Sequence, residues 1–143
     1  MPSAKAPLHQ PAPSPSHRIV PLPAAFSDSR GAIQTLVEGG FSAAQIITSK
    51  AGTVRSNHYH KTDWHYLYVL SGSMRYLHRP VGSKQEPESA IVGAGQLVYT
   101  PPLVEHATEF LEDTVLLNLA GGARDQSSYE ADLVRVELIK PKN

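Results

Sequence analysis

Residues 52–72 read GTVRSNHYHKTDWHYLYVLSG and contain three histidines within eight residues, His58, His60 and His65. In a β-strand, side chains two residues apart project from the same face, so His58 and His60 would lie side by side. The same alternation sends residues 65, 67 and 69 to one face and residues 66, 68 and 70 to the other. A histidine pair at this spacing is how a strand presents two metal ligands. The stretch therefore leaves two interpretations, surface histidines or a metal site, and the rest of the sequence is needed to decide between them.

The rest of the chain is divided into short β-favouring runs by glycine, proline and polar residues. We expect strands in HRIVPL (17–22), AIQTLV (32–37), AAQIITS (43–49), HYLYVLSG (65–72), SMRYLHR (73–79), SAIV (89–92), QLVYT (96–100), TVLLNLA (114–120) and LVRVELI (133–139). Runs of this length and spacing are typical of an all-β barrel or sandwich. No segment shows helical periodicity with caps, although QSSYEAD (126–132) can form a single turn.

Proline marks the N-terminal part of the chain, where seven of the twelve prolines lie within the first 23 residues. Proline lacks a backbone N–H and fixes φ, so we expect residues 1–17 to form an extended or disordered tail. Residues 18–140 are long enough for one domain with its own core. The same prolines interrupt any apolar signal segment, and no apolar run approaches the roughly 20 residues that cross a bilayer. We therefore expect a cytoplasmic protein with no membrane partner.

Charge and cysteine content exclude several classes of function. Thirteen lysines and arginines balance thirteen aspartates and glutamates, so the net charge is zero. Without a basic surplus, a nucleic-acid partner is not expected. The chain has no cysteine, which excludes a disulfide scaffold, a thiolate zinc site and a cysteine nucleophile.

Two blocks of sequence carry a further pattern. The first contains Gly52, His58, His60, His65 and Gly72, and the second contains Gly95, Pro101 and His106. Their order and spacing resemble the two motifs of the cupin superfamily, over residues 45–120. The resemblance implies an all-β fold, the cupin double-stranded β-helix or jelly-roll barrel. It also implies one divalent transition metal ion, such as Fe, Mn, Ni or Zn, held by His58, His60, His65 and His106.

Three residues depart from the family pattern. His65 stands where cupins have a glutamate, Leu103 where the second motif has a glycine, and Phe110 where it has an asparagine. Imidazole is a good ligand for all of these metals. Four neutral imidazoles would leave the full +2 charge on the metal, whereas a glutamate would reduce it to +1. Such a site is expected to be a stronger Lewis acid and to favour an anionic or enolisable ligand.

The flanking segments 26–40 and 113–137 resemble parts of nucleotide-sugar cupins, namely deoxysugar 3,4-ketoisomerases and, more distantly, RmlC-like 3,5-epimerases. Ketoisomerases have a similar histidine–x–histidine–lysine stretch, matched by residues 58–61, and a late segment that resembles Asp125 to Tyr129. This resemblance implies a histidine pair that moves protons. A histidine of near-neutral pKa suits that role, but it cannot bind a metal and act as a free base at once. His65 and His106 complete a ligand set, which favours a metal.

Three residues are candidates for contact with a substrate, His60, Arg55 and Tyr99. His60 belongs to the proton-moving pair that the resemblance implies. Arginine suits a phosphate group and tyrosine can donate to a carbonyl, which are the roles expected of Arg55 and Tyr99. A solvated loop position for Arg55 and core packing for Tyr99 are the alternatives.

Two acidic residues and one charged segment flank these candidates. Asp63 and Glu105 can orient an imidazole as partners of the ligands, although a position facing solvent is favoured for both. The segment RDQSSYEADLVR (124–135) is expected to be a solvated excursion before the last strand, with a dimer contact as the alternative.

These observations favour a metal-binding cupin enzyme that acts on a small carbonyl or sugar-type substrate, in the isomerase or epimerase class. One alternative is a mononuclear Fe(II) dioxygenase, since an all-histidine site can leave open positions for substrate and O₂. Another is a cupin that binds a ligand without turnover. The expected partners are a small-molecule substrate and a second copy of the chain, because barrels of this size often pair by exchanging edge strands. Fold analogy alone does not choose among these functions.

Overall fold

The computed structural model of this protein describes residues 19–140, so the predicted tail at residues 1–17 lies outside it. The strands are β1 (Phe26–Asp28), β2 (Gly31–Ile33), β3 (Ala43–Ser49), β4 (Val54–His60), β5 (His65–Ser71), β6 (Ser73–Pro80), β7 (Glu88–Gly93), β8 (Leu97–Thr100), β9 (Val104–Phe110), β10 (Thr114–Ala120) and β11 (Leu133–Arg135). Over the same residues there is one helix, α1 (Gln126–Asp132), at the segment that allowed a single turn. Asp125 caps this helix, because its carboxylate accepts a hydrogen bond from Ser128 N.

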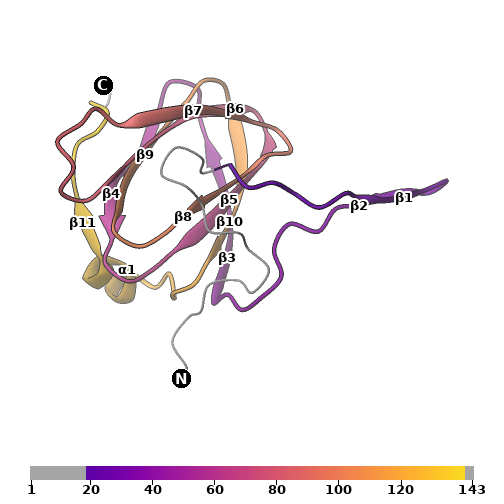
Figure 1. Ribbon diagram of the computed structural model, residues 1–143, viewed down its shortest axis with the longest axis horizontal. Coiled ribbons are helices and arrows are strands. Elements are labelled where there is room, and N and C mark those ends of the chain that lie inside the picture. Colours follow the sequence, from indigo (N-terminus) through magenta and orange to yellow (C-terminus); the bar gives the residue numbers. More distant parts are fainter. Residues whose placement is uncertain (1–18, 141–143) are drawn as a thin grey trace.

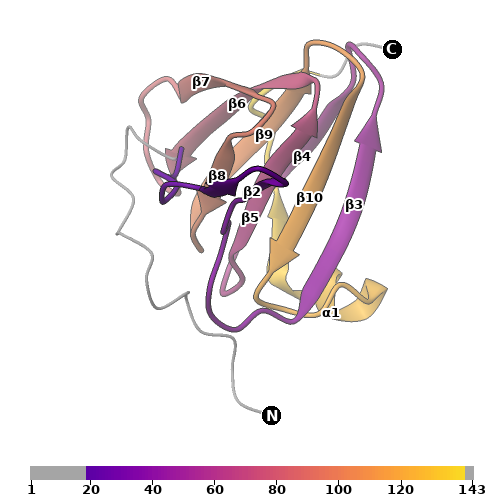
Figure 2. The same ribbon diagram turned by 90° about the vertical axis from the view of Figure 1, so that its right-hand side faces the viewer.

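Two antiparallel sheets face each other and curl into a barrel (Figure 1). One sheet has the order β3-β10-β5-β8, and the other has the order β11-β4-β9-β6-β7. The chain crosses repeatedly from one sheet to the other, which is the connectivity of a jelly roll. Figure 2 shows β3 at the edge of the four-stranded sheet. The arrangement confirms the predicted all-β jelly-roll fold.

The N-terminal part of the described chain has less strand than expected. Within residues 17–22, Ile19 forms an isolated bridge to Val98 and no strand follows it. Prolines at positions 21 and 23 have no N–H to donate to a ladder, which explains this interruption. The strand expected over residues 32–37 ends at Ile33.

The last strand is also shorter than expected, because the side chain of Asn57 takes the backbone groups that follow it. Strand β11 stops at Arg135. Leu138 N and Ile139 N donate to Asn57 Oδ1 at 3.0 and 3.1 Å, and Asn57 Nδ2 donates to Ile139 O at 2.8 Å. One side chain therefore fastens the C-terminal segment to β4.

Two of the turn positions with a left-handed backbone bear on the site. Gly72 joins β5 to β6 with φ 92°, and a Cβ there would lie 2.5 Å from Asp113 O, so only glycine fits. Leu103, where cupins have glycine, adopts φ 61°. Its N–H donates to His60 O at 2.8 Å, so this strained residue closes the end of β4. A leucine in the left-handed region carries strain of about 1–2 kcal/mol that a glycine would not carry.

Both faces of the four-stranded sheet are apolar. On its inner face, Leu67 and Val69 belong to a buried cluster between the two sheets. On its outer face, Tyr66 belongs to a second buried cluster with Trp64 and Tyr99. The alternation predicted for β5 is confirmed, and burial on both sides explains why this strand reads as an almost continuous apolar run.

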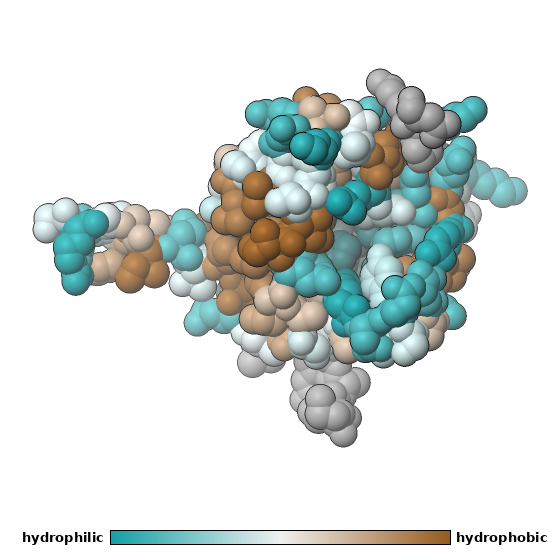
Figure 3. Space-filling view, turned by 180° about the vertical axis from the view of Figure 1, so that it is seen from behind, coloured by the Kyte–Doolittle hydropathy of each residue, from teal (hydrophilic) through white to brown (hydrophobic). Residues whose placement is uncertain are grey.

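A hairpin of β1 and β2, residues 26–33, projects from the body of the barrel, and we call it the arm (Figures 1 and 3). Phe26 and Ile33 lie opposite each other in its register, and they are 60% and 68% exposed. Along residues 19–140, no helix is long and apolar enough to cross a membrane.

Candidate active site

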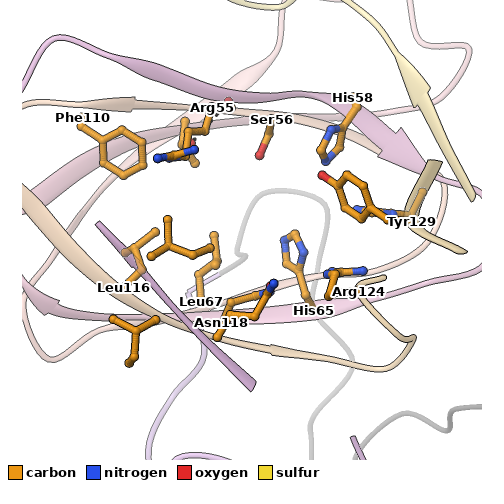
Figure 4. Close-up of a pocket in the computed structure, with 15 residues that line it drawn as sticks. Arg55, Ser56, His58, His65, Leu67, Phe110, Leu116, Asn118, Arg124 and Tyr129 are labelled. Atoms are coloured by element: carbon orange, nitrogen blue, oxygen red, sulfur yellow. Dashed lines mark hydrogen bonds between the residues drawn. The ribbon is translucent and has the colours of Figure 1, made fainter. Parts of the chain in front are cut away.

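A cavity of about 360 Å³ opens between the two sheets. The strands β3, β4, β5, β9 and β10 line it, together with the segment that forms α1 (Figure 4). Its lining residues are Gln45, Ile46, Ile47, Arg55, Ser56, His58, His60, His65, Leu67, Thr108, Phe110, Leu116, Asn118, Arg124 and Tyr129. The end beside α1 is polar, whereas Leu67, Phe110 and Leu116 gather at the opposite end (Figure 4).

A β-bulge in β4 directs Arg55 into this cavity. In a regular strand, residues three apart face opposite sides, so Arg55 and His58 would not share a cavity. Ser56 and Asn57 both have positive φ, 71° and 55°, and the register of β4 against β9 shifts between Ser56 and His58. A bulge of this kind re-aims a side chain, and asparagine tolerates the left-handed region better than most residues.

The four histidines predicted as ligands lie together on three strands. His58 and His60 come from β4, His65 comes from β5, and His106 comes from β9, where it pairs with His58 in the ladder. The ring centroids of His58 and His106 are 4.8 Å apart, those of His58 and His60 are 4.9 Å apart, and those of His65 and His106 are 5.2 Å apart. All four are buried, with at most 7% of each exposed.

Burial keeps these imidazoles uncharged. Desolvation lowers the pKa of His58 to about 2 and that of His106 to about 3. It also lowers the pKa of His60, and it lowers that of His65 well below its ordinary value. His106 Nδ1 lies 2.9 Å from Val104 O, and a carbonyl can only accept, so Nδ1 carries the proton and Nε2 keeps the lone pair.

Several of the buried imidazole nitrogens have no hydrogen-bond partner within residues 19–140. They are Nε2 of His60, Nε2 of His65 and Nε2 of His106, whereas His60 Nδ1 faces Asp132 Oδ2 at 3.4 Å. Leaving such a buried group unpaired costs about 1–3 kcal/mol, which a bound ligand would remove. The donor atoms of His58, His60 and His106 all lie within 4.8 Å of one another, close enough to hold one ion, and His65 is not part of that group. The donor set therefore fits a divalent transition metal through three of the four predicted ligands.

The segment that forms α1 closes the polar end of the cavity, and the sequence reasoning did not place it in the site. Arg124 and Tyr129 line the cavity. Arg124 Nη1 forms a short ion pair with Asp63 Oδ2, and the two side chains are 9% and 7% exposed. Asp63 is therefore buried, against the expectation that it faces solvent, and its partner is an arginine rather than an imidazole. One feature of the sequence pointed to Tyr129: the segment from Asp125 to Tyr129 resembles a late segment of ketoisomerases.

Two other carboxylates near the histidines have clear partners. Glu105 is buried rather than solvated, and its Oε1 accepts from Arg79 Nε at 2.8 Å. Asp132, which the sequence reasoning did not single out, has its Oδ2 3.4 Å from His60 Nδ1. The carboxylate of Asp132 also accepts from Thr62 N at 3.0 Å, so it is held in place beside His60.

Of the residues predicted to contact a substrate, His60 and Arg55 line the cavity. Arg55 Nε donates to Ser49 Oγ at 2.7 Å, and Nη2 donates to Thr48 O at 3.0 Å. These bonds tie β4 to β3 across the space between the sheets. The guanidinium keeps further N–H groups for a ligand.

Tyr99 does not line the cavity. In the ladder of β5 and β8, Tyr99 pairs with Tyr66 and so shares its outward direction, whereas its neighbour Thr100 pairs with His65. The rings of Tyr99 and Tyr66 lie 4.8 Å apart in the outer apolar cluster. The prediction that Tyr99 contacts a substrate is therefore wrong, because strand alternation places it on the other face of the sheet.

The lowered histidine pKa values predict a stability that falls on acidification. The folded pKa values lie below the unfolded value of about 6.5, so the unfolded chain binds more protons as pH falls through this window. The free energy of unfolding is therefore highest above pH 6.5. At pH 5, each such histidine should lower it by about 2 kcal/mol. Urea unfolding of chelator-treated protein at pH 7.5 and pH 5 measures this loss.

The matched variant is His106→Asn, whose amide can still donate to Val104 O. We expect its free energy of unfolding to change less between the two pH values, by about 2 kcal/mol. An equal loss in both proteins would contradict the burial of an uncharged imidazole at this position.

Comparisons with known proteins add to this geometry. No family model matches the chain, and no curated protein sequence matches it. Among solved structures, a double mutant of the 3,4-ketoisomerase QdtA from Thermoanaerobacterium thermosaccharolyticum, in complex with TDP, is 26% identical. The match covers 78% of this chain and 82% of that chain, with a TM-score of 0.63.

Two further solved structures share the fold. The 3'-monoepimerase ChmJ from Streptomyces bikiniensis, in complex with dTDP-quinovose, is 18% identical over 81% of this chain and 70% of that chain, with a TM-score of 0.67. The capsular polysaccharide assembling protein CapF from Staphylococcus aureus is 24% identical over 82% of this chain and 35% of that chain, with a TM-score of 0.62. The barrel and the two histidine motifs agree with these neighbours: the chain has the cupin jelly-roll fold and resembles RmlC-like sugar 3,4-ketoisomerases and epimerases.

Proposed function

We propose that this protein is an isomerase or epimerase that acts on a keto sugar linked to a nucleoside diphosphate. The observation that carries the proposal is the group of buried, uncharged imidazoles with unpartnered nitrogens at the end of an open cavity. The likeness of the chain to a 3,4-ketoisomerase solved in complex with TDP supports the proposed substrate class. A cytoplasmic location stays a prediction.

The cavity residues suit proton transfer next to a carbonyl. A neutral imidazole takes the proton from the carbon beside the carbonyl, the C–H electron pair forms a C=C bond, and the carbonyl oxygen takes up a proton. Return of a proton to the former carbonyl carbon, with loss of the O–H proton from the hydroxyl on the first carbon so that this carbon becomes the carbonyl, completes a ketoisomerisation. Return of a proton to the opposite face of the first carbon, with loss of the proton from the enol oxygen, completes an epimerisation. His60 is the best placed histidine, because Asp63 and Asp132 oppose the effect of burial on its pKa.

Arg55 is placed to hold the diphosphate. It lines the cavity at a distance from the histidine end, and its guanidinium is oriented by the bonds to Ser49 and Thr48. A planar guanidinium fixed in this way matches the geometry of phosphate oxygens.

The activity is tested with TDP-4-keto-6-deoxyglucose, which has been solved in complex with QdtA. In D₂O we expect NMR to show deuterium at the carbon beside the carbonyl and a new keto sugar. His60→Gln should lower kcat about 10²- to 10⁴-fold. Arg55→Met should raise KM about tenfold or more, the loss expected for hydrogen bonds to a charged group.

Arg75→Met is the matched control for Arg55, because Arg75 pairs with Glu109 at 2.9 Å and does not line the cavity. Its kinetic constants should equal those of the parent. Absence of deuterium from the recovered sugar would rule out this substrate class.

As the alternative to a metal-free site in which His60 is the base, we propose that the site holds one divalent transition metal ion, with His58, His60 and His106 as its ligands and His65 beside them as the histidine left free to move a proton. The support is the unpartnered nitrogens and the short separations of the donor atoms. A bound ion would polarise the oxygen of a carbonyl. The chain's part is to hold uncharged imidazoles in a fixed arrangement through the ladder of β4 and β9, and to exclude bulk water.

Elemental analysis of untagged protein purified without chelators tests the metal. We expect about one transition metal ion per chain, absent from the double variant His58→Ala/His106→Ala, since only His60 of the three proposed ligands would remain. Iron would favour the dioxygenase alternative, whereas zinc, nickel or manganese would favour isomerisation. No metal in the parent, before or after soaking, would leave His58 and His60 as a metal-free proton-moving pair.

We propose further that the protein forms a homodimer through the arm. A two-stranded hairpin is marginally stable alone, and the arm exposes Phe26 and Ile33 (Figure 3). Phe26 and Ile33 are suited to pack against an apolar surface of a second copy of the chain. The edge strand β3, with Ile46 62% exposed, is a matching surface on the same chain.

Sedimentation equilibrium tests this dimer. The parent should sediment as a dimer, and Phe26→Ser/Ile33→Ser should sediment as a monomer, because the apolar contact is removed. Ile91→Ser is the control, since Ile91 is 57% exposed on β7 of the other sheet. A parent that is monomeric, or a dimer that survives the double substitution, would contradict an interface through the arm.

A further inference from the structure

Tyr129 presents a free hydroxyl to the histidine end of the cavity. Its ring centroid lies 6.1 Å from that of His58 and 5.8 Å from that of His60. Figure 4 shows the hydroxyl directed into the cavity, on the side of His58. Within the described chain no residue bonds to this hydroxyl, although the ring is half-buried. Burial raises the pKa of Tyr129, so the group stays protonated and can donate.

Arg124 lies beneath this ring and fixes it. Its Cζ is 5.2 Å from the centre of the Tyr129 ring, a distance at which a guanidinium is attracted to the face of an aromatic ring. Arg124 Nη1 is in turn bound to Asp63 Oδ2. The three side chains form a stack that begins in the barrel and ends in the cavity, and we call it the Asp63–Arg124–Tyr129 stack.

Hydrogen bonds hold Asp63 rigidly at the buried end of the stack. Its Oδ1 accepts from Trp64 N at 2.8 Å and from Gly122 N at 2.7 Å. A Cβ at Gly122 would lie 3.0 Å from the Asp63 carboxylate, so the chain comes this close because the residue is glycine. The helix that carries Tyr129 is held at its other end, where the Asp132 carboxylate accepts from Asp63 N at 3.0 Å.

We propose that Tyr129 is a substrate-binding residue whose hydroxyl donates a hydrogen bond to a sugar oxygen beside His58 and His60, and that Arg124, fixed by Asp63, positions it. The inference rests on the proposed function for the identity of the substrate. It adds a contact from the one helical segment of the described chain, on the opposite side of the sugar from the diphosphate site at Arg55.

The positioning is tested without any ligand. The chain has six tyrosines, so protein labelled with 3-fluorotyrosine should give six ¹⁹F resonances, and Tyr129→Phe identifies the one from the stack. We expect Arg124→Met to move this resonance toward that of free fluorotyrosine, because the ring loses its support. Arg124→Lys keeps a cation under the ring and should restore the resonance in part. An unchanged resonance in Arg124→Met would overturn the role of Arg124.

Two further variants keep the measurement decisive. Arg124→Met leaves the Asp63 charge unpaired, which can unfold the protein, so Asp63→Asn/Arg124→Met removes both charges and should move the resonance equally. Arg135→Met removes an exposed ion pair with Glu130 on the same helix and should leave the resonance in place.

Binding of TDP-glucose and TDP, compared by calorimetry, tests the contact with substrate. Tyr129→Phe should weaken TDP-glucose about 5- to 15-fold and leave TDP unchanged, because only the former carries a hexose to accept the bond. Equal affinities for TDP-glucose in parent and variant would overturn this contact. A parent that binds neither compound would overturn the proposed substrate class and the contact with it, while the fluorine spectra would still decide the role of Arg124.

Discussion

A small β-barrel that buries four imidazoles side by side, those of His58, His60, His65 and His106, must keep them uncharged, and this constraint governs the site. A protonated imidazole between the two sheets would require a buried counter-charge. The carboxylates nearest the histidines already have partners, since Asp63 binds Arg124, Glu105 binds Arg79, and Asp132, beside His60, accepts from Thr62 N and Asp63 N. The histidines therefore offer lone pairs rather than charge, and the fixed positive groups of the cavity are Arg55 and Arg124. Such a cavity is complementary to a cation held by nitrogen and to an anionic organic ligand at the same time.

The segment between β10 and β11 covers one end of the barrel and forms the polar end of the cavity. Its two glycines permit the approach, because a Cβ at Gly121 would lie 2.5 Å from the Trp64 indole. Leu133 then pairs with His60 in the ladder of β11 and β4, which returns the chain to the five-stranded sheet. The polar end of the cavity is thus closed by residues whose positions are set from both sheets.

The sequence was sufficient for the parts of the structure that follow strand alternation. The alternation of residues 65–70 and the two histidine motifs correctly predict which side chains meet inside the barrel, because a ladder repeats every two residues. Arg55 was predicted to contact a phosphate from its residue type alone; strand alternation would place it opposite His58, and its inward position depends on a bulge at Ser56 and Asn57 that breaks this period. The position of Tyr99 was predicted wrongly for a related reason. Every residue of β8 is buried, so its residue types do not indicate which face of the strand lines the cavity. Asp63 reads as a surface residue until its partner Arg124, sixty-one positions later, is known.

Regular and irregular backbone therefore have different roles in this barrel. The ladder of β4 and β9 holds His58 opposite His106, and such a pairing tolerates little change because a register shift would move every inward side chain. The bulge that directs Arg55 and the short helix that carries Tyr129 lie outside this constraint. Chain segments of this kind vary more freely than the ladders they connect. Since these two segments supply the groups that can meet the two ends of a substrate, changes in them would alter the ligand while the imidazoles stay in place.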